Sequence, residues 1–122
     1  MARQARFNRD NTRYGKRHKP GVMNRTERAY ADLLEGQRLA GDIIGWLFEP
    51  MKFRLADRCF YTPDFMIFHN DQTLEFVDVK GGGPINEGAI IKGKCAAEAY
   101  WFFKFTMAER LPDRSGWKRT EF

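Results

Sequence analysis

Residues 73–80 constrain the fold of this chain more than any other segment. They read Thr-Leu-Glu-Phe-Val-Asp-Val-Lys, and the Gly-Gly-Gly-Pro run at 81–84 ends them. Side chains alternate between the two faces of a strand, so Asp78 and Lys80 share one face while the valines beside them face the core. The pattern predicts a buried strand that carries a carboxylate and an ammonium group together near its end.

A second acidic residue precedes this strand. The stretch 60–68 is expected to be a strand, and Pro63 within it indicates an edge, a bulge or a strand start. A short polar turn separates it from residues 73–80. If the two strands pair, Asp64 lies near Asp78, which places two carboxylates and one ammonium group in a single small site.

Two carboxylates in one site suit a divalent metal. Mg²⁺ takes oxygen ligands, typically one or two carboxylates together with waters and substrate phosphate. The expected ligands are Asp64, Asp78 and the backbone carbonyl of Val79, with Mn²⁺ as a substitute for Mg²⁺; they are compatible with one metal ion or two. Lys80 is expected to orient the attacking water or to stabilise developing charge. Glu75 falls on the opposite face of the strand and is left out of the site.

The other elements follow from periodicity and punctuation. Asn24 with Glu27 three residues later forms a capping-box pattern that opens a helix ending near Gly41. An apolar run at 43–48 is ended by Pro50. Strands, a second helix and a last strand are then expected at 51–56, 60–68, 73–80, 86–99 and 100–105. The order reads α-β-β-β-α-β and predicts an α/β fold with a central mixed sheet flanked by helices.

Several single residues carry structural expectations. Residues 107–122 are polar, with Trp117 and Phe122 as anchors, whereas Trp46 and Trp101 are expected in the core. The two cysteines, Cys59 and Cys95, have no metal-ligand spacing and are expected to be buried free thiols.

The chain of 122 residues is long enough for one domain or for half of an intertwined dimer. Its charge is unevenly distributed along the sequence. Residues 1–25 hold eight basic side chains and one acid, so they carry +7, and the remainder of the +5 chain carries −2. Residues 1–22 are therefore expected to be a basic flexible arm, and residues 23–122 the folded domain. The basic residues expected to contact nucleic acid in the arm are Arg3, Arg6, Arg9, Arg13, Lys16, Arg17 and Lys19.

Composition argues against several classes of protein. No apolar run approaches the ~20 residues needed to span a bilayer, and the Arg-rich N-terminus lacks the apolar region of a secretory signal. Residues 81–83 lack the Lys-Ser/Thr that follows the glycines of a phosphate loop, and no organic cofactor is expected. The expectation is a cytoplasmic protein.

The residues of the acidic site resemble those of a known nuclease superfamily. Pro63-Asp64 followed by Asp78-Val79-Lys80 is similar to the motif of the PD-(D/E)xK nucleases, which often have Glu at the position of Asp78. The predicted element order resembles the restriction-endonuclease-like core of that superfamily. The Tyr-Thr-Pro-Asp-Phe run at 61–65 and the strand ending in Lys-Gly further resemble phage endonuclease I, a Holliday junction resolvase. The resemblance covers residues 24–105, about two-thirds of the chain.

This resemblance implies a Mg²⁺-dependent endonuclease that hydrolyses phosphodiester bonds in DNA. Branched DNA, such as a Holliday junction in phage recombination or replication, is the implied substrate, and a homodimer is implied because resolution needs two symmetric cuts. Glu27 is the implied third acid, or else only a capping glutamate. Lys92 and Lys94 on the second helix would contact phosphate or assist the attacking water, or belong to a solvated face.

Two other functions are compatible with the sequence. The chain could nick DNA without preference for its structure, or it could be a non-catalytic nucleic-acid-binding or inhibitor protein on a nuclease scaffold. Nothing in the sequence is typical of a base-reading helix, so recognition through shape and backbone is expected.

Deleting residues 1–22 should weaken binding to every DNA sequence, because the phosphates that the arm neutralises would keep their counterions. The slope of log K against log salt concentration should become shallower by ~0.9 for each phosphate that the shortened protein no longer neutralises. Fluorescence anisotropy over a salt series measures this slope. An unchanged slope would show that the arm only improves solubility.

Overall fold

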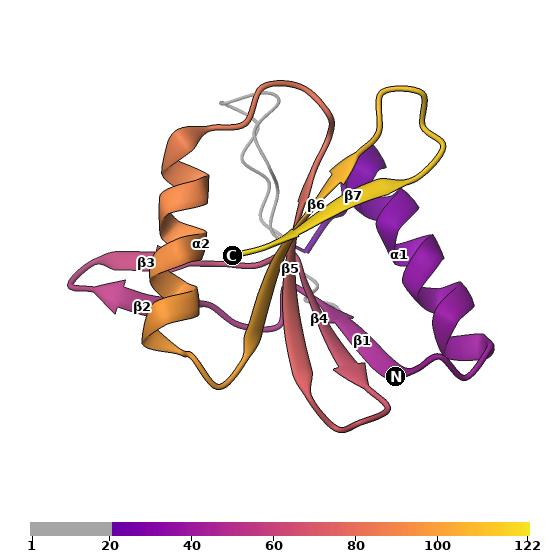
Figure 1. Cartoon of the computed structure of the whole chain (residues 1–122), viewed down its shortest axis with the longest axis horizontal. Helices are drawn as coiled ribbons and strands as arrows, with labels where there is room; N and C mark the ends of the chain where they lie inside the picture. Colours follow the sequence, from indigo (N-terminus) through magenta and orange to yellow (C-terminus); the bar gives the residue numbers. More distant parts are fainter. Residues whose placement is uncertain (1–20) are drawn as a thin grey trace.

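The computed structural model describes residues 21–122 (Figure 1). The seven basic residues predicted to contact nucleic acid between Arg3 and Lys19 lie outside the described residues.

The described chain is an α/β fold with two helices and two sheets. The elements are α1 (Arg25–Leu39), β1 (Ile43–Phe48), β2 (Phe53–Ala56), β3 (Cys59–Tyr61), β4 (Phe65–His69), β5 (Leu74–Lys80), α2 (Glu87–Ala99), β6 (Lys104–Arg110) and β7 (Trp117–Glu121). The main sheet has the order β1-β4-β5-β6-β7, and β2 with β3 forms a separate hairpin. Only β5 and β6 pair in parallel within the main sheet. Neither helix in residues 21–122 has the length and apolar character to cross a membrane.

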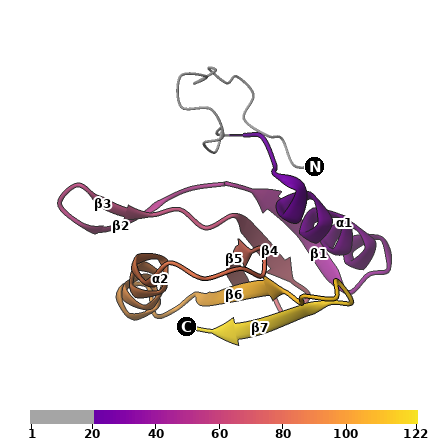
Figure 2. The same cartoon turned by 90° about the horizontal axis from the view of Figure 1, so that it is seen from above.

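The two helices lie on either side of the main sheet (Figure 1). On the α1 side, Tyr30 and Leu34 pack with Phe65 of β4 and with the valines of β5. On the α2 side, aromatic side chains from β2, β5 and β6 form a second buried cluster with Ala96. The β2–β3 hairpin reaches over α2 (Figure 2) and contributes Phe53 to this second cluster. The mixed sheet flanked by helices is thus as predicted.

The ends of the helices are set by local interactions. The Asn24 side chain accepts a hydrogen bond from the Glu27 N–H at 2.7 Å, and Glu27 Oε1 accepts one from the Asn24 N–H at 2.9 Å. The predicted capping box is confirmed. At the other helix, a Cβ on Gly93 would lie 2.4 Å from the Phe122 ring, so only glycine admits this ring against α2. Phe122 anchors the C-terminus, as predicted.

The stretch 60–68 is two strands, and the prediction of a single strand was wrong. Its first residues belong to β3 in the small hairpin, and its last ones to β4 in the main sheet. Pro63 lies at the break, where it has no N–H to donate to a ladder. The predicted strand at 51–56 is observed as β2, but in the hairpin and not in the main sheet.

The last strand lies later in the chain than predicted. β6 begins at Lys104, because its parallel register with β5 pairs Lys104 with Glu75 and leaves residues 100–103 as the connection from α2. Trp101 is 77% exposed in this connection, so the prediction that it lies in the core was wrong. The aromatic content of residues 100–105 favours a strand, but the register with β5 decides where β6 starts.

Two further differences concern the C-terminal region and the cysteines. Residues 117–121 form the edge strand β7, which was not predicted, and Trp117 on it packs against Tyr30 as an anchor. Cys95 is exposed on α2 and Cys59 is half-buried, so the expectation of two buried thiols was wrong, although both are free.

Two adjacent leucines of α1 test the packing of this helix on the sheet. Leu34 is 1% exposed and Leu33 is 39% exposed. Leu34→Ala should lower the free energy of unfolding by about 2–5 kcal/mol, because it removes a buried side chain. Leu33→Ala should change it by no more than about 0.5 kcal/mol. Urea unfolding of both variants measures the difference, and equal effects would contradict this packing.

Candidate active site

The backbone of Asp64 is held between two strands. Its N–H donates to the Val77 carbonyl of β5 at 3.0 Å, and its carbonyl accepts from the N–H of Glu49, just after β1, at 2.7 Å. Asp64 therefore continues the sheet although it precedes β4. Because Phe65 faces α1, alternation turns the Asp64 side chain to the other face, the one that Asp78 occupies.

The structure brings Asp64, Asp78 and Lys80 together, as the pairing of their strands predicts. The Asp64 carboxyl lies within hydrogen-bonding reach of the Asp78 carboxyl. Asp64 Oδ2 also accepts a hydrogen bond from the Val79 N–H at 2.7 Å. On the other side, Lys80 Nζ lies 3.1 Å from Asp78 Oδ2. Asp78 is only 7% exposed, whereas Asp64 and Lys80 are half-buried, so the group lies at the edge of the core.

The electrostatics of the site are those of two crowded carboxyl groups. Burial, followed by the charge of Asp78 and the hydrogen bond to it, raises the pKa of Asp64 well above its usual range. The N–H of Val79 offsets part of this rise, and the charge of Glu27 adds to it. Two carboxylates this close need a proton or a cation between them, so the pair has a built-in affinity for positive charge.

Tyr61 is a site residue that sequence reasoning missed. Its hydroxyl is buried and has no hydrogen-bond partner within the described residues. Burial, then the charges of Asp78 and Asp64, raises the pKa of this phenol. Tyr61 belongs to β3 in the other sheet, and it lies near the carboxylates because the chain bends between β3 and β4, at Pro63 and Asp64. No periodicity in the sequence signals that contact.

Glu27 is both a cap and a neighbour of the acidic pair. Its Oε1 accepts a hydrogen bond from the Asn24 N–H in the capping box. Glu27 is nonetheless 5% exposed, and its charge raises the pKa of Asp64. The cap therefore directs a buried carboxylate toward Asp64, and its role as a third acid stays a prediction.

The donor set fits a hard divalent cation. Asp64 and Asp78 offer carboxylate oxygens, and the unpartnered Tyr61 hydroxyl adds a neutral oxygen beside them. Within residues 21–122, no three His, Cys, Asp or Glu side chains are arranged to hold a metal by themselves. Val79 contributes its N–H to Asp64, and the predicted role of its carbonyl as a ligand stays a prediction.

Other candidate residues lie apart from the pair. Lys92 and Lys94 are exposed on α2, and in the described part of the chain no hydrogen bond or ion pair joins either one to the carboxylates. Their predicted contact with phosphate is not tested by this arrangement.

Glu75 lies on the α1 side of β5, as predicted, and it belongs to a separate polar cluster. It accepts hydrogen bonds from Thr106, Arg119 and His69. Burial alone would raise the pKa of Glu75, but the Thr106 and His69 hydrogen bonds and the Arg119 charge lower it. Glu75 is thus a satisfied structural carboxylate.

Comparison of the chain with protein-family models, with curated proteins and with solved structures gave no match. Function is therefore inferred from the arrangement of the residues themselves.

The raised pKa of Asp64 predicts that the metal-free protein loses stability as the pH rises. The unfolded chain gives up this proton above about pH 4, while the folded chain keeps it to a higher pH. Unfolding in that window releases a proton, so the free energy of unfolding falls by up to about 1.4 kcal/mol per pH unit. Urea unfolding with a chelator between about pH 5 and pH 8 should show this slope.

Asp64→Asn removes the titrating group and should flatten the slope, making the variant more stable than the wild type at the alkaline end. Asp32→Asn, on the exposed face of α1, is the matched control and should keep the wild-type slope. Equal slopes in Asp64→Asn and the wild type would show that Asp64 is ionised throughout this window.

Proposed function

We propose that this protein is a metal-dependent nuclease that hydrolyses phosphodiester bonds in DNA. The observation that carries the proposal is the meeting of Asp64, Asp78 and Lys80 where β5 ends and β4 begins. Two crowded carboxylates that favour a cation, with an ammonium group beside them, are suited to a substrate that is itself an anion.

Each residue has a distinct part in this proposal. Asp64 and Asp78 would hold Mg²⁺, with Glu27, Tyr61 and the Val79 carbonyl as further oxygen donors. When bound, Mg²⁺ lowers the pKa of a water and offsets charge on the phosphate. Lys80 holds its ammonium group at Asp78 and is placed to orient the attacking water or to stabilise charge on the phosphate oxygens.

The order of elements supports a restriction-endonuclease-like core. With the β2–β3 hairpin and β7 set aside, the chain reads α1-β1-β4-β5-α2-β6, an α-β-β-β-α-β order in which β1 takes the place that was predicted for residues 51–56. The acidic residues lie at the junction of two neighbouring strands of this core. We therefore retain the PD-(D/E)xK superfamily as the proposed relationship, on the motif and on its position in the sheet.

Branched DNA is the proposed substrate, and a homodimer the proposed form. Both follow from the resemblance to phage junction resolvases, and the basic residues 1–25 are suited to the close-set phosphates of a junction. The alternatives are nicking of DNA regardless of its structure, and binding without catalysis.

Asp78→Asn should reduce Mg²⁺-dependent cleavage of a four-way junction by at least about 100-fold. Mutation of a residue that only hydrogen-bonds to a metal ligand already lowers metal affinity or activity by about 10–100-fold, and Asp78 is a proposed ligand itself. DNA binding should persist, since the variant keeps the basic residues. Asp32→Asn is the control and should cleave at the wild-type rate. Rates are measured on the junction and on linear duplexes made from its arms, with Mn²⁺ in a second series.

The possible results separate the candidate functions. Cleavage of the junction alone supports a resolvase, and equal cleavage of junction and arms supports a nicking enzyme. Cleavage that survives Asp78→Asn would disprove the proposed site. Calorimetry with Mn²⁺ addresses the non-catalytic alternative, for which no heat depends on Asp64 or Asp78.

A further inference from the structure

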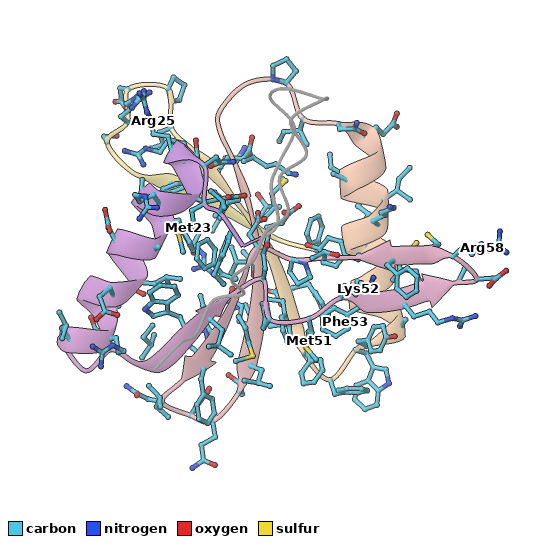
Figure 3. All side chains as sticks on the ribbon, turned by 180° about the vertical axis from the view of Figure 1, so that it is seen from behind. Met23, Arg25, Met51, Lys52, Phe53 and Arg58 are labelled. Atoms are coloured by element: carbon cyan, nitrogen blue, oxygen red, sulfur yellow. The ribbon has the colours of Figure 1, made fainter. Side chains whose placement is uncertain are left out.

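A pocket of about 280 Å³ lies beside the end of β5 and has a strongly basic lining. It is formed by the first turns of α1, the glycines after β5 and the loop from β6 to β7. Its polar lining residues include Arg25, Thr26, Arg110 and Arg114, and no Asp or Glu of residues 21–122 lines it. Figure 3 shows Arg25 at the start of α1, next to the loop between β6 and β7.

The three arginines of this pocket have no acidic partner in the described part of the chain. The ion pairs of residues 21–122 involve Arg38, His69, Lys80 and Arg119 as the cations. Arg110 is a notable case, because its Nε is buried and has no hydrogen-bond partner. Three guanidinium groups that share a concave surface repel one another unless an anion joins them.

Arg110 and the glycines are held in place by packing. The Arg110 guanidinium lies 4.8 Å from the centre of the Trp117 ring. Gly82 has a φ of +104°, and a Cβ there would lie 3.0 Å from the Arg110 carbonyl. Glycine is therefore required for the chain after β5 to run against the end of β6. This packing positions Arg110 and the backbone after β5, which reduces the entropic cost of binding a ligand there.

Arg114 is presented by an ordered loop. The Leu111 N–H donates to the Gly116 carbonyl and the Arg114 N–H to the Leu111 carbonyl, at 2.9 and 2.8 Å. The Asp113 carboxylate accepts from Ser115, at 2.7 Å from its hydroxyl and 3.0 Å from its N–H. The acid nearest to Arg114 in sequence is thus used within the loop.

The size and chemistry of the pocket fit one phosphate group. At about 280 Å³, the pocket has room for a phosphate group together with several waters. Arginine presents a planar fork of N–H donors that matches phosphate oxygens in pairs. In the chain, Thr26 of the lining directly precedes Glu27, and Gly81 of the lining directly follows Lys80. The pocket therefore adjoins the candidate active site.

We propose that this pocket binds a phosphate of the nucleic acid close to the bond that is cleaved. The assignment of a nucleic acid rests on the proposed function, whereas the phosphate site itself rests on the pocket alone. The phosphate is either an internal backbone group or a terminal one. Binding it here fixes the strand beside Asp64 and Asp78.

The first experiment uses inorganic phosphate as the probe. Amide resonances of the ¹⁵N-labelled full chain are followed during titration at constant ionic strength, with a chelator present. The amides of Gly81, Gly82 and Arg114 should shift and saturate. In the double variant Arg25→Gln/Arg114→Gln, affinity should fall by about tenfold for each arginine, the usual effect of losing a hydrogen bond to a charged group.

The matched control removes the same charge elsewhere. Arg58 lies at the tip of the β2–β3 hairpin (Figure 3), and Lys118 is exposed on β7. Arg58→Gln/Lys118→Gln should bind phosphate as the wild type does. Equal weakening in the two double variants, or shifts that do not saturate, would overturn the proposal.

The second experiment uses DNA with and without a terminal phosphate. A loss of affinity in Arg25→Gln/Arg114→Gln that is confined to the phosphorylated oligonucleotide assigns a terminal group. A loss that is equal for both assigns an internal one, and no loss for either would overturn the assignment to nucleic acid. If phosphate binds as expected but no DNA is cleaved, the pocket stands and the nuclease proposal fails. If DNA is cleaved and phosphate does not bind, the nuclease proposal stands and the phosphate pocket fails.

Discussion

The crowding of two carboxyl groups in one site is the constraint on which this structure depends. Asp64 and Asp78 lie within hydrogen-bonding reach, with Asp78 buried and Asp64 half-buried, so ionising both is unfavourable without a cation between them. Such an arrangement costs folding free energy, so the rest of the structure must hold the two groups together. The Asp64 backbone is fixed on both sides, by Val77 of β5 and by Glu49 after β1. The main sheet therefore holds the two acids together, and their need for a cation is the link between the fold and the proposed metal-dependent chemistry.

The two hydrophobic clusters explain why the pair lies at this place in the sheet. On the α1 side, Tyr30 and Phe65 pack with the valines of β5, and on the α2 side Phe53 and Phe76 pack with Phe105. Both clusters cover β5, the central strand, and its final residues extend past them toward solvent. Lys80 is accordingly half-buried, while residues 75–79 are buried. Apolar packing along β5 thus supports the charged group at its end.

The parts of this arrangement that depend on neighbouring residues could be predicted from the sequence. The capping box of Asn24 and Glu27, and the shared face of Asp78 and Lys80, each follow from local spacing and period. Contacts between distant segments could not be predicted in the same way. Tyr61 lies near the carboxylates because the chain bends at Pro63 and Asp64, and β6 starts at Lys104 only because it aligns with β5. The arginine pocket likewise joins three segments that have no common pattern in the sequence.

The fold also keeps the acidic pair apart from the arginines of the pocket. Arg25, Arg110 and Arg114 gather next to α1, whereas the acidic pair faces the α2 side of the sheet, with the end of β5 between them. Had these arginines reached the carboxylates, they would have formed ion pairs and competed with the proposed metal ion. Among the basic side chains of residues 21–122, only Lys80 forms an ion pair with Asp78, and a flexible ammonium group is displaced more readily than a bidentate guanidinium. The fold thus presents acidic groups on one side of the end of β5 and basic groups on the other, an arrangement that is consistent with the proposed binding of a metal ion and a phosphodiester.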